Sequence, residues 1–185
     1  MIVKLRDIGT IVTGNTPKTS EKENYISKDI PFVKPSDISD DEITYLTESE
    51  FYISEYARSK ARILPPNSVL FTCIGIIGKV AINENECAFN QQINAIIPNN
   101  KFNSNYIYYL MEYISPYLQS IAGTSATAIV NKETFERVKV KVHILEEQKK
   151  IDSLLSYIET KIILEDKLLN NLKQLKKGLM QNMFV

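Results

Sequence analysis

The last part of this chain of 185 residues constrains its fold most. Residues 146–182 contain no proline and one glycine. Nonpolar residues recur there at intervals of three and four, which places them along one face of an α-helix. A helix of about 35 residues is roughly 50 Å long. Residues 1–145 are too few to bury such a helix along both sides, so its nonpolar face must pack against a helix of another chain.

Seven residues form the nonpolar stripe that we predict to mediate dimerisation. Glu165 and Lys176 interrupt the stripe. Polar residues at such positions lower stability, but they can fix the register and the number of partner helices. The predicted dimerisation residues are Ile151, Leu155, Ile158, Ile162, Leu169, Leu172 and Leu179.

The preceding part of the chain changes pattern every few residues, which is typical of a mixed α/β domain. Val138, Val140, Val142 and Ile144 alternate with polar residues and predict a strand with a basic outer face. We predict an α+β fold: a domain at 1–145 followed by a long coiled-coil helix at 146–185. Further strands are expected at 11–13, 30–34, 68–73, 79–82 and 93–97, and helices at 54–61, 104–118 and 131–136.

Composition excludes several classes of protein. The 22 basic and 22 acidic residues cancel, so a protein that coats DNA through overall positive charge is excluded. His143 is the single histidine, and neither a catalytic constellation nor a metal-ligand cluster is visible. Cys73 and Cys87 are expected to be buried free thiols. Without a signal peptide or membrane-spanning run, a cytoplasmic location is expected.

Several motifs resemble type I restriction–modification specificity subunits. Leu5–Gly9 with Gly14–Pro17 resembles the opening of their target-recognition domain. Val69–Thr72, Gly78–Ile82 and Phe89–Ile96 also match this family. The most specific element is the junction Leu-Glu-Glu-Gln-Lys-Lys-Ile at 145–151, which leads into the long helix. The resemblance covers nearly the whole chain, but the family often has proline just before this leucine, where this chain has Ile144.

The resemblance implies one recognition domain and one spacer helix, half of the family's usual complement. It implies that paired helices form an antiparallel coiled coil holding two recognition domains on double-stranded DNA. It further implies that modification (methyltransferase) subunits, which bind S-adenosylmethionine and methylate adenine, dock on these helices. Restriction (motor/nuclease) subunits can join the same complex. The chain itself is expected to need no cofactor. A homodimer would recognise a bipartite palindrome, whereas a mixed pair would recognise an asymmetric site.

Two loops carry side chains suited to base edges in the major groove. Basic residues elsewhere are candidates for phosphate contacts, although a solvated surface is the better explanation for any single one. Asn90, Gln91 and Gln92 either contact bases or satisfy backbone groups between strands. The first loop offers Asn15, Thr16, Lys18 and Thr19; the second offers Thr124, Ser125, Thr127, Asn131 and Lys132; the phosphate candidates are Lys34, Arg58, Lys60, Arg62 and Lys79.

An alternative function stays open on the sequence alone. The chain could be a protein-interaction subunit that captures or redirects a host methyltransferase through the helix, without productive DNA recognition. Both hypotheses require the same helix, and the net charge of zero favours neither.

Overall fold

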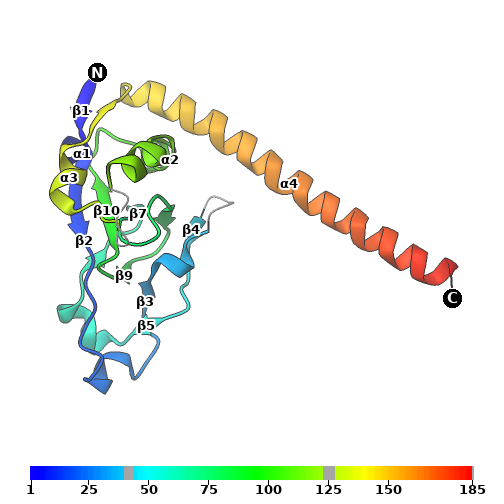
Figure 1. Ribbon diagram of the computed structural model, residues 1–185, viewed down its shortest axis with the longest axis horizontal. Helices are drawn as coiled ribbons and strands as arrows, with labels where there is room; N and C mark the ends of the chain where they lie inside the picture. The colour runs from blue at the N-terminus through cyan, green and yellow to red at the C-terminus, as the bar shows by residue number, and fades with distance from the viewer. Residues whose placement is uncertain (40–43, 123–127, 185) are drawn as a thin grey trace. The chain divides into compact units, whose positions relative to one another are not determined.

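The computed structural model describes residues 1–39, 44–122 and 128–184. It forms two compact units, Met1–Lys149 and the segment from Lys150 onward. We call the first unit the body. Figure 1 labels its main elements and the long helix α4 (Leu145–Met183).

The strands of the body are short. They are β1 (Ile2–Lys4), β2 (Gly9–Thr13), β3 (Ile30–Val33), β4 (Thr44–Leu46), β5 (Tyr52–Ile53), β6 (Ile63–Leu64), β7 (Val69–Thr72), β8 (Val80–Asn83), β9 (Cys87–Phe89), β10 (Ile93–Pro98) and β11 (Lys139–Lys141). A five-stranded sheet has the order β2-β10-β7-β8-β4, and a four-stranded sheet has the order β5-β3-β9-β6. The pairs β4–β8 and β3–β9 are parallel.

Helices connect and cover these strands. The α-helices of the body are α1 (Leu5–Ile8), α2 (Ser104–Ile121) and α3 (Lys132–Arg137), and the 3-10 helices are η1 (Lys22–Tyr25), η2 (Pro35–Asp37) and η3 (Glu55–Lys60). The α+β prediction, with a long C-terminal helix, is confirmed.

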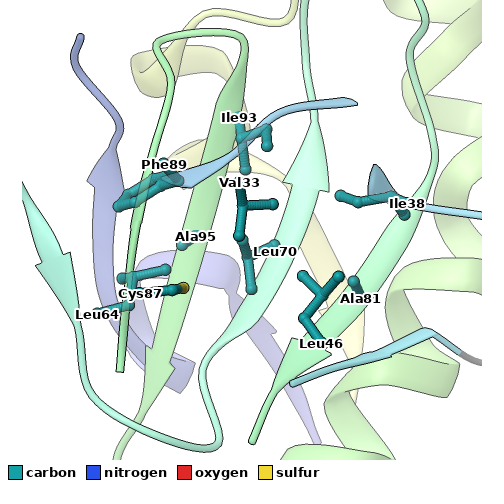
Figure 2. Close-up of a cluster of buried hydrophobic side chains, with 10 residues drawn as sticks. All are labelled: Val33, Ile38, Leu46, Leu64, Leu70, Ala81, Cys87, Phe89, Ile93 and Ala95. Atoms are coloured by element: carbon teal, nitrogen blue, oxygen red, sulfur yellow. The ribbon is translucent and has the colours of Figure 1, made fainter. Parts of the chain in front are cut away.

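The main core lies between the two larger sheets. Leu70 and Ala95 come from the five-stranded sheet, and Cys87 and Phe89 come from the four-stranded sheet. Figure 2 shows these side chains gathered with other buried residues of the cluster. Each of these strands therefore buries one of its two faces in this core.

The outer faces of both sheets are also covered. Side chains alternate across a strand, so Phe71 points away from the core that holds its neighbour Leu70. Its ring centre lies 5.4 Å from that of Phe135 on α3. On the other sheet, Phe32 packs with Ala57 of η3. The body therefore has a helical layer outside each of its two central sheets.

Helix α2 extends beyond its predicted end. The sequence predicted a helix at 104–118, with its end left open by Pro116, but the helix continues to Ile121. Pro116 lacks the N–H that would bind the carbonyl of Glu112. Both residues are exposed, so water can bind that carbonyl and the helix tolerates the proline.

The predicted strand at 138–144 is shorter in the structure. Val138, Val140 and Val142 are buried as predicted, but β11 ends at Lys141 and Ile144 is 59 % exposed. The predicted inward position of Ile144 is wrong. The chain turns after Val142 to enter α4, so the alternation no longer continues.

The first strand closes the body by pairing with the last. Antiparallel pairing aligns Ile2 with Lys141 and Lys4 with Lys139. The N-terminal ammonium of Met1 also donates to the carbonyl of Val142, at 2.7 Å. The strand that leads into α4 is therefore held by the beginning of the chain.

The first turn of α4 belongs to the body and is anchored by a buried glutamine. Gln148 is 1 % exposed. Its side-chain amide donates to the carbonyls of His143 at 2.9 Å and Lys101 at 3.3 Å. Its carbonyl accepts from the backbone N–H of Asn103 at 3.0 Å. The predicted helix start at 146 lies one residue after the observed start, Leu145.

Candidate nucleic-acid interface

Several connections leave the five-stranded sheet at the same end. Residue pairing aligns Thr13, the last residue of β2, with Asn94 of β10. Thr72, the last residue of β7, aligns with Ile93, where β10 begins. The connection from β7 to β8 leaves at this end too. The loop after β2, the turn before β10 and the β7–β8 connection therefore lie together, and we call this end of the sheet the loop end.

Side-chain hydrogen bonds join these segments. The hydroxyl of Thr16 donates to Oε1 of Gln91 at 2.7 Å. The hydroxyl of Thr13 donates to Oδ1 of Asn94 at 2.6 Å, and Nδ2 of Asn94 donates to the carbonyl of Val130 at 3.3 Å. The buried amide of Asn94 thus links the end of β2 to the segment before α3.

Backbone contacts bring in the β7–β8 connection. Ile74 and Ile129 form an isolated antiparallel bridge. Gly75 and Gly78 adopt positive φ angles of 75° and 109°, which glycine adopts without steric cost. Ile76 between these glycines is 56 % exposed, and Ile129 is 45 % exposed. The loop end therefore presents nonpolar as well as polar side chains, and nonpolar side chains can contact the methyl group of thymine.

The first predicted loop divides into supporting and exposed residues. Asn15 donates to the carbonyl of Lys60 and accepts from the backbone N–H of Arg62, both at 2.7 Å. Its amide therefore braces the loop. Thr16, Lys18 and Thr19 are exposed, and the Lys18 side chain has 81 % of its area open to solvent.

Glycine is required where this loop leaves the sheet. A Cβ atom on Gly14 would lie 2.1 Å from the carbonyl oxygen of Asn90 and 2.4 Å from that of Phe89. The backbone N–H of Asn15 donates to the same carbonyl of Phe89 at 3.0 Å. The close approach of the two backbones places the first loop directly beside the turn before β10.

Two of the basic side chains predicted to contact phosphate interact with neighbouring side chains of the body. Nζ of Lys34 lies 3.0 Å from the ring centre of Phe51. Arg58 forms 2.5 Å ion pairs with Glu86 and Glu55, and these hydrogen bonds raise the pKa of its guanidinium further above the usual value. The two carboxylates offset the charge of Arg58, which weakens its attraction for phosphate.

The remaining predicted phosphate contacts also have partners in the body. Lys60 pairs with Glu21 at 2.7 Å, and this hydrogen bond raises the pKa of the lysine. Arg62 donates to the backbone carbonyl of Thr13. Nζ of Lys79 donates to the carbonyl of Ile38 at 2.9 Å. Of these three, Arg62 contacts the end of β2 and Lys79 ends the β7–β8 connection, so both lie at the loop end.

The second predicted loop is described only in part. Thr124, Ser125 and Thr127 lie outside the described residues. Asn131 caps α3, because its side chain accepts from the backbone N–H of Thr134 at 2.9 Å. Lys132 is exposed and lies 3.5 Å from Glu136.

The hydrogen bonds of Asn90 favour the structural alternative for this residue. Asn90 is buried, and it accepts from the backbone N–H of Gln92 at 3.1 Å and donates to that side chain at 2.9 Å. It satisfies a backbone group between strands. Gln91 is exposed at the loop end. Sequence reasoning missed Ile76 and Ile129, although the glycines flanking the Ile76–Ile77 pair indicated an exposed connection.

The described residues do not form a cluster of metal-ligating side chains. Cys73 and Cys87 are buried free thiols, as predicted. Burial raises the pKa of Cys73 to about 11 and that of Cys87 to about 12, so both are protonated at neutral pH. Within the described part of the chain, the helices also fall short of the length and nonpolarity needed to cross a membrane.

Helix α4 presents its nonpolar stripe to solvent. Ile158, Ile162, Leu169, Leu172 and Leu179 are each 45–55 % exposed. Ile151 and Leu155 have intermediate exposure. Among the described residues of the helix, only Gln148 is buried. An exposed stripe of this length is typical of a helix that packs against a partner.

Comparisons with a family model and with individual known proteins agree on one family. Residues 1–174 match the type I restriction modification DNA specificity domain. The chain is 35 % identical to the type I restriction enzyme MjaIX specificity subunit of Methanocaldococcus jannaschii over 188 aligned positions, which cover 100 % of this chain and 43 % of that protein. The chain thus spans less than half the length of this relative. This relative and a second one, from Haemophilus influenzae, are both named as specificity subunits of type I restriction enzymes.

Solved structures share the fold. A chain from a structure of type I restriction–modification complex assembly has a TM-score of 0.78 at 20 % identity, covering 97 % of this chain and 43 % of that chain. The HsdS subunit from Thermoanaerobacter tengcongensis has a TM-score of 0.71 at 20 % identity, covering 91 % and 39 %. The chain belongs to the family of type I restriction modification DNA specificity domains.

Proposed function

We propose that the chain recognises a DNA sequence through the loop end of its five-stranded sheet. The observation that carries this proposal is the convergence there of the loop after β2, the turn before β10, the β7–β8 connection and the segment before α3. These segments present amide, hydroxyl, lysine and nonpolar side chains, the groups that distinguish base edges in the major groove. Family membership supports the same function.

The proposed assembly is a homodimer paired through α4. The exposed stripe supports it, since five of its residues remain about half exposed. The relative from M. jannaschii is more than twice as long as this chain, so two copies would supply a comparable length. A dimer with twofold symmetry would recognise a bipartite palindrome.

The proposed partners are double-stranded DNA and type I modification subunits. The modification subunits would bind S-adenosylmethionine and methylate adenine, and restriction subunits would join for cleavage. The complex would act in the cytoplasm. The chain would supply the choice of sequence, while its partners would supply the chemistry.

Co-expression with a type I modification subunit in an unmethylated host tests this function. Methyladenine is mapped by sequencing the genome. We expect a bipartite, palindromic mark. An asymmetric mark would retain DNA recognition but replace the homodimer with a mixed pair. A complex that co-purifies but leaves no mark would contradict DNA recognition and favour capture of the methyltransferase.

Lys132→Ala provides a residue-level prediction. If the exposed ammonium at the start of α3 contacts phosphate, affinity falls about equally for all sequences. The plot of log affinity against log salt then becomes shallower by about one. The measurement is fluorescence anisotropy over a salt series.

Lys139→Ala is the matched control, since this exposed lysine lies on β11 beside β1. It should leave both the affinity and the salt slope unchanged. Loss of discrimination at one base pair in Lys132→Ala would make Lys132 a base contact. Unchanged binding would remove it from the interface.

A further inference from the structure

The body contains a cavity of about 690 Å³ beside the loop after β2. This volume lies within the range of small-molecule pockets. Nonpolar surface predominates in it, with two lysines at its edge. The side chains that matter for its chemistry are Lys22, Tyr25, Ile26, Phe32, Lys34 and Phe51.

The cavity is lined by three aromatic side chains, which differ in exposure. The hydroxyl of Tyr25 donates to the carbonyl of Pro17 at 2.7 Å, which fixes the ring. Phe32 is 2 % exposed, whereas Phe51 is 42 % exposed. The cavity therefore presents the fixed ring of Tyr25 and the partly exposed ring of Phe51, on which a flat, unsaturated ring can stack.

The charge of the cavity favours an anionic ligand. Its described lining residues include Lys22 and Lys34 but no carboxylate. The ammonium of Lys34 lies over the ring of Phe51. A cation–π contact at an exposed site is weak, so this ammonium can leave the ring for a phosphate. A flat ring joined to a phosphate is the chemistry of a nucleotide.

The cavity is continuous with the loop end. Thr16 and Asn90 line it. The hydroxyl of Thr16 also binds Gln91 at the loop end, at 2.7 Å. The cavity and the proposed DNA interface therefore have Thr16 in common, so a nucleotide of DNA bound at the loop end lies within reach of the cavity.

We propose that this cavity receives one base swung out of the bound duplex. The base stacks beside Tyr25 and Phe51, and Lys22 and Lys34 bind its flanking phosphates. The inference rests on the proposed DNA recognition. It adds that the body distorts the duplex and does not only contact base edges. Swinging a base out requires it to unstack and unpair, which is easier at a mismatch than at a matched pair.

The test uses the full chain and duplexes that contain the half-site identified by methylation mapping. Each duplex carries one mismatch, and its affinity is compared with that of the matched duplex. We expect a mismatch at one position to increase the affinity of the wild-type protein roughly tenfold, which corresponds to about 1.4 kcal/mol. 2-Aminopurine at that position should become more fluorescent when the protein binds, because the base leaves the stack.

Phe51→Ala should abolish both the tighter binding of the mismatched duplex and the rise in 2-aminopurine fluorescence. Tyr117→Ala is the matched control, since Tyr117 is an aromatic residue that is 56 % exposed on α2, and it should retain both effects. Lys34→Ala provides a second test, because it leaves the aromatic rings intact and should reduce the mismatch effect.

Three outcomes separate the possibilities. Absence of sequence-specific binding by the wild type would overturn the proposed function, and this inference with it. Sequence-specific binding with no position at which a mismatch tightens binding would overturn the inference alone. Loss of methyltransferase association in Phe51→Ala, with no mismatch effect in the wild type, would identify the cavity as a protein-docking site instead.

Discussion

Replacing Leu169 and Leu172 by glutamate is expected to convert the proposed homodimer to monomers. Both side chains lie on the exposed stripe of α4. Burying a leucine side chain stabilises an association by about 1.5–3 kcal/mol. Each of these side chains is already about half covered in the single chain, so the loss of four of them weakens the homodimer by about 3 kcal/mol or more, which corresponds to at least about a hundredfold. Sedimentation velocity at micromolar concentration measures the change directly.

A control for charge is available on the same helix. Asn171→Glu with Gln174→Glu adds the same two negative charges outside the predicted stripe, and should leave the dimer intact. Circular dichroism of both variants checks that helix content is retained. A dimer that persists in Leu169→Glu/Leu172→Glu would show that α4 does not pair the two copies through this stripe.

Replacing Gln148 by leucine is expected to lower the free energy of unfolding by about 3 kcal/mol. The amide binds backbone groups of Lys101, Asn103 and His143. Leucine has a similar size but cannot form these hydrogen bonds. Each buried polar group left without a partner costs about 1–3 kcal/mol. Chemical denaturation monitored by tyrosine fluorescence measures the loss.

A pH series separates lost hydrogen bonds from lost packing. Gln148→Glu retains the shape of the side chain, and burial should raise the pKa of the new carboxyl above its unfolded value of about 4.3. Its destabilisation relative to wild type should therefore be small below about pH 4.3, and should grow as the pH rises through the folded pKa.

Lys150→Leu is the control for this position. It lies at an exposed site two residues further along α4 and should change stability by less than about 0.5 kcal/mol. Equal denaturation midpoints for wild type and Gln148→Leu would show that the amide does not hold the first turn of α4.

Periodicity predicted the parts of the fold that depend on neighbours in the sequence. The stripe from Ile151 to Leu179 indicated α4, and buried runs such as Val69–Thr72 indicated strands. These patterns arise because each element must bury a face with a fixed repeat. Where the chain changes direction, as after Val142, the repeat no longer applies, and the predicted strand was too long.

The candidate interface was less predictable, because its contacts join distant parts of the sequence. Thr16 binds Gln91, 75 positions away, and Arg58 binds Glu86, 28 positions away. The local sequence placed Asn15 near a turn. It did not indicate that the side-chain amide of Asn15 hydrogen-bonds to the backbone of residues 60 and 62. Local patterns identify which side chains can contact DNA, whereas the sheet pairing determines which of them meet.

The pairing of β1 with β11 has a consequence for the order of folding. Ile2 and Lys141 must meet to complete the body, and pairing over such a separation is slow. On the ribosome, the roughly forty residues after Lys141 take seconds to synthesise, which gives the body time to close before α4 is complete. Refolding from denaturant reverses this order, because a helix forms within about a microsecond. The nonpolar stripe then forms beside unfinished sheets, so dilution from denaturant favours aggregation that synthesis in the cell avoids.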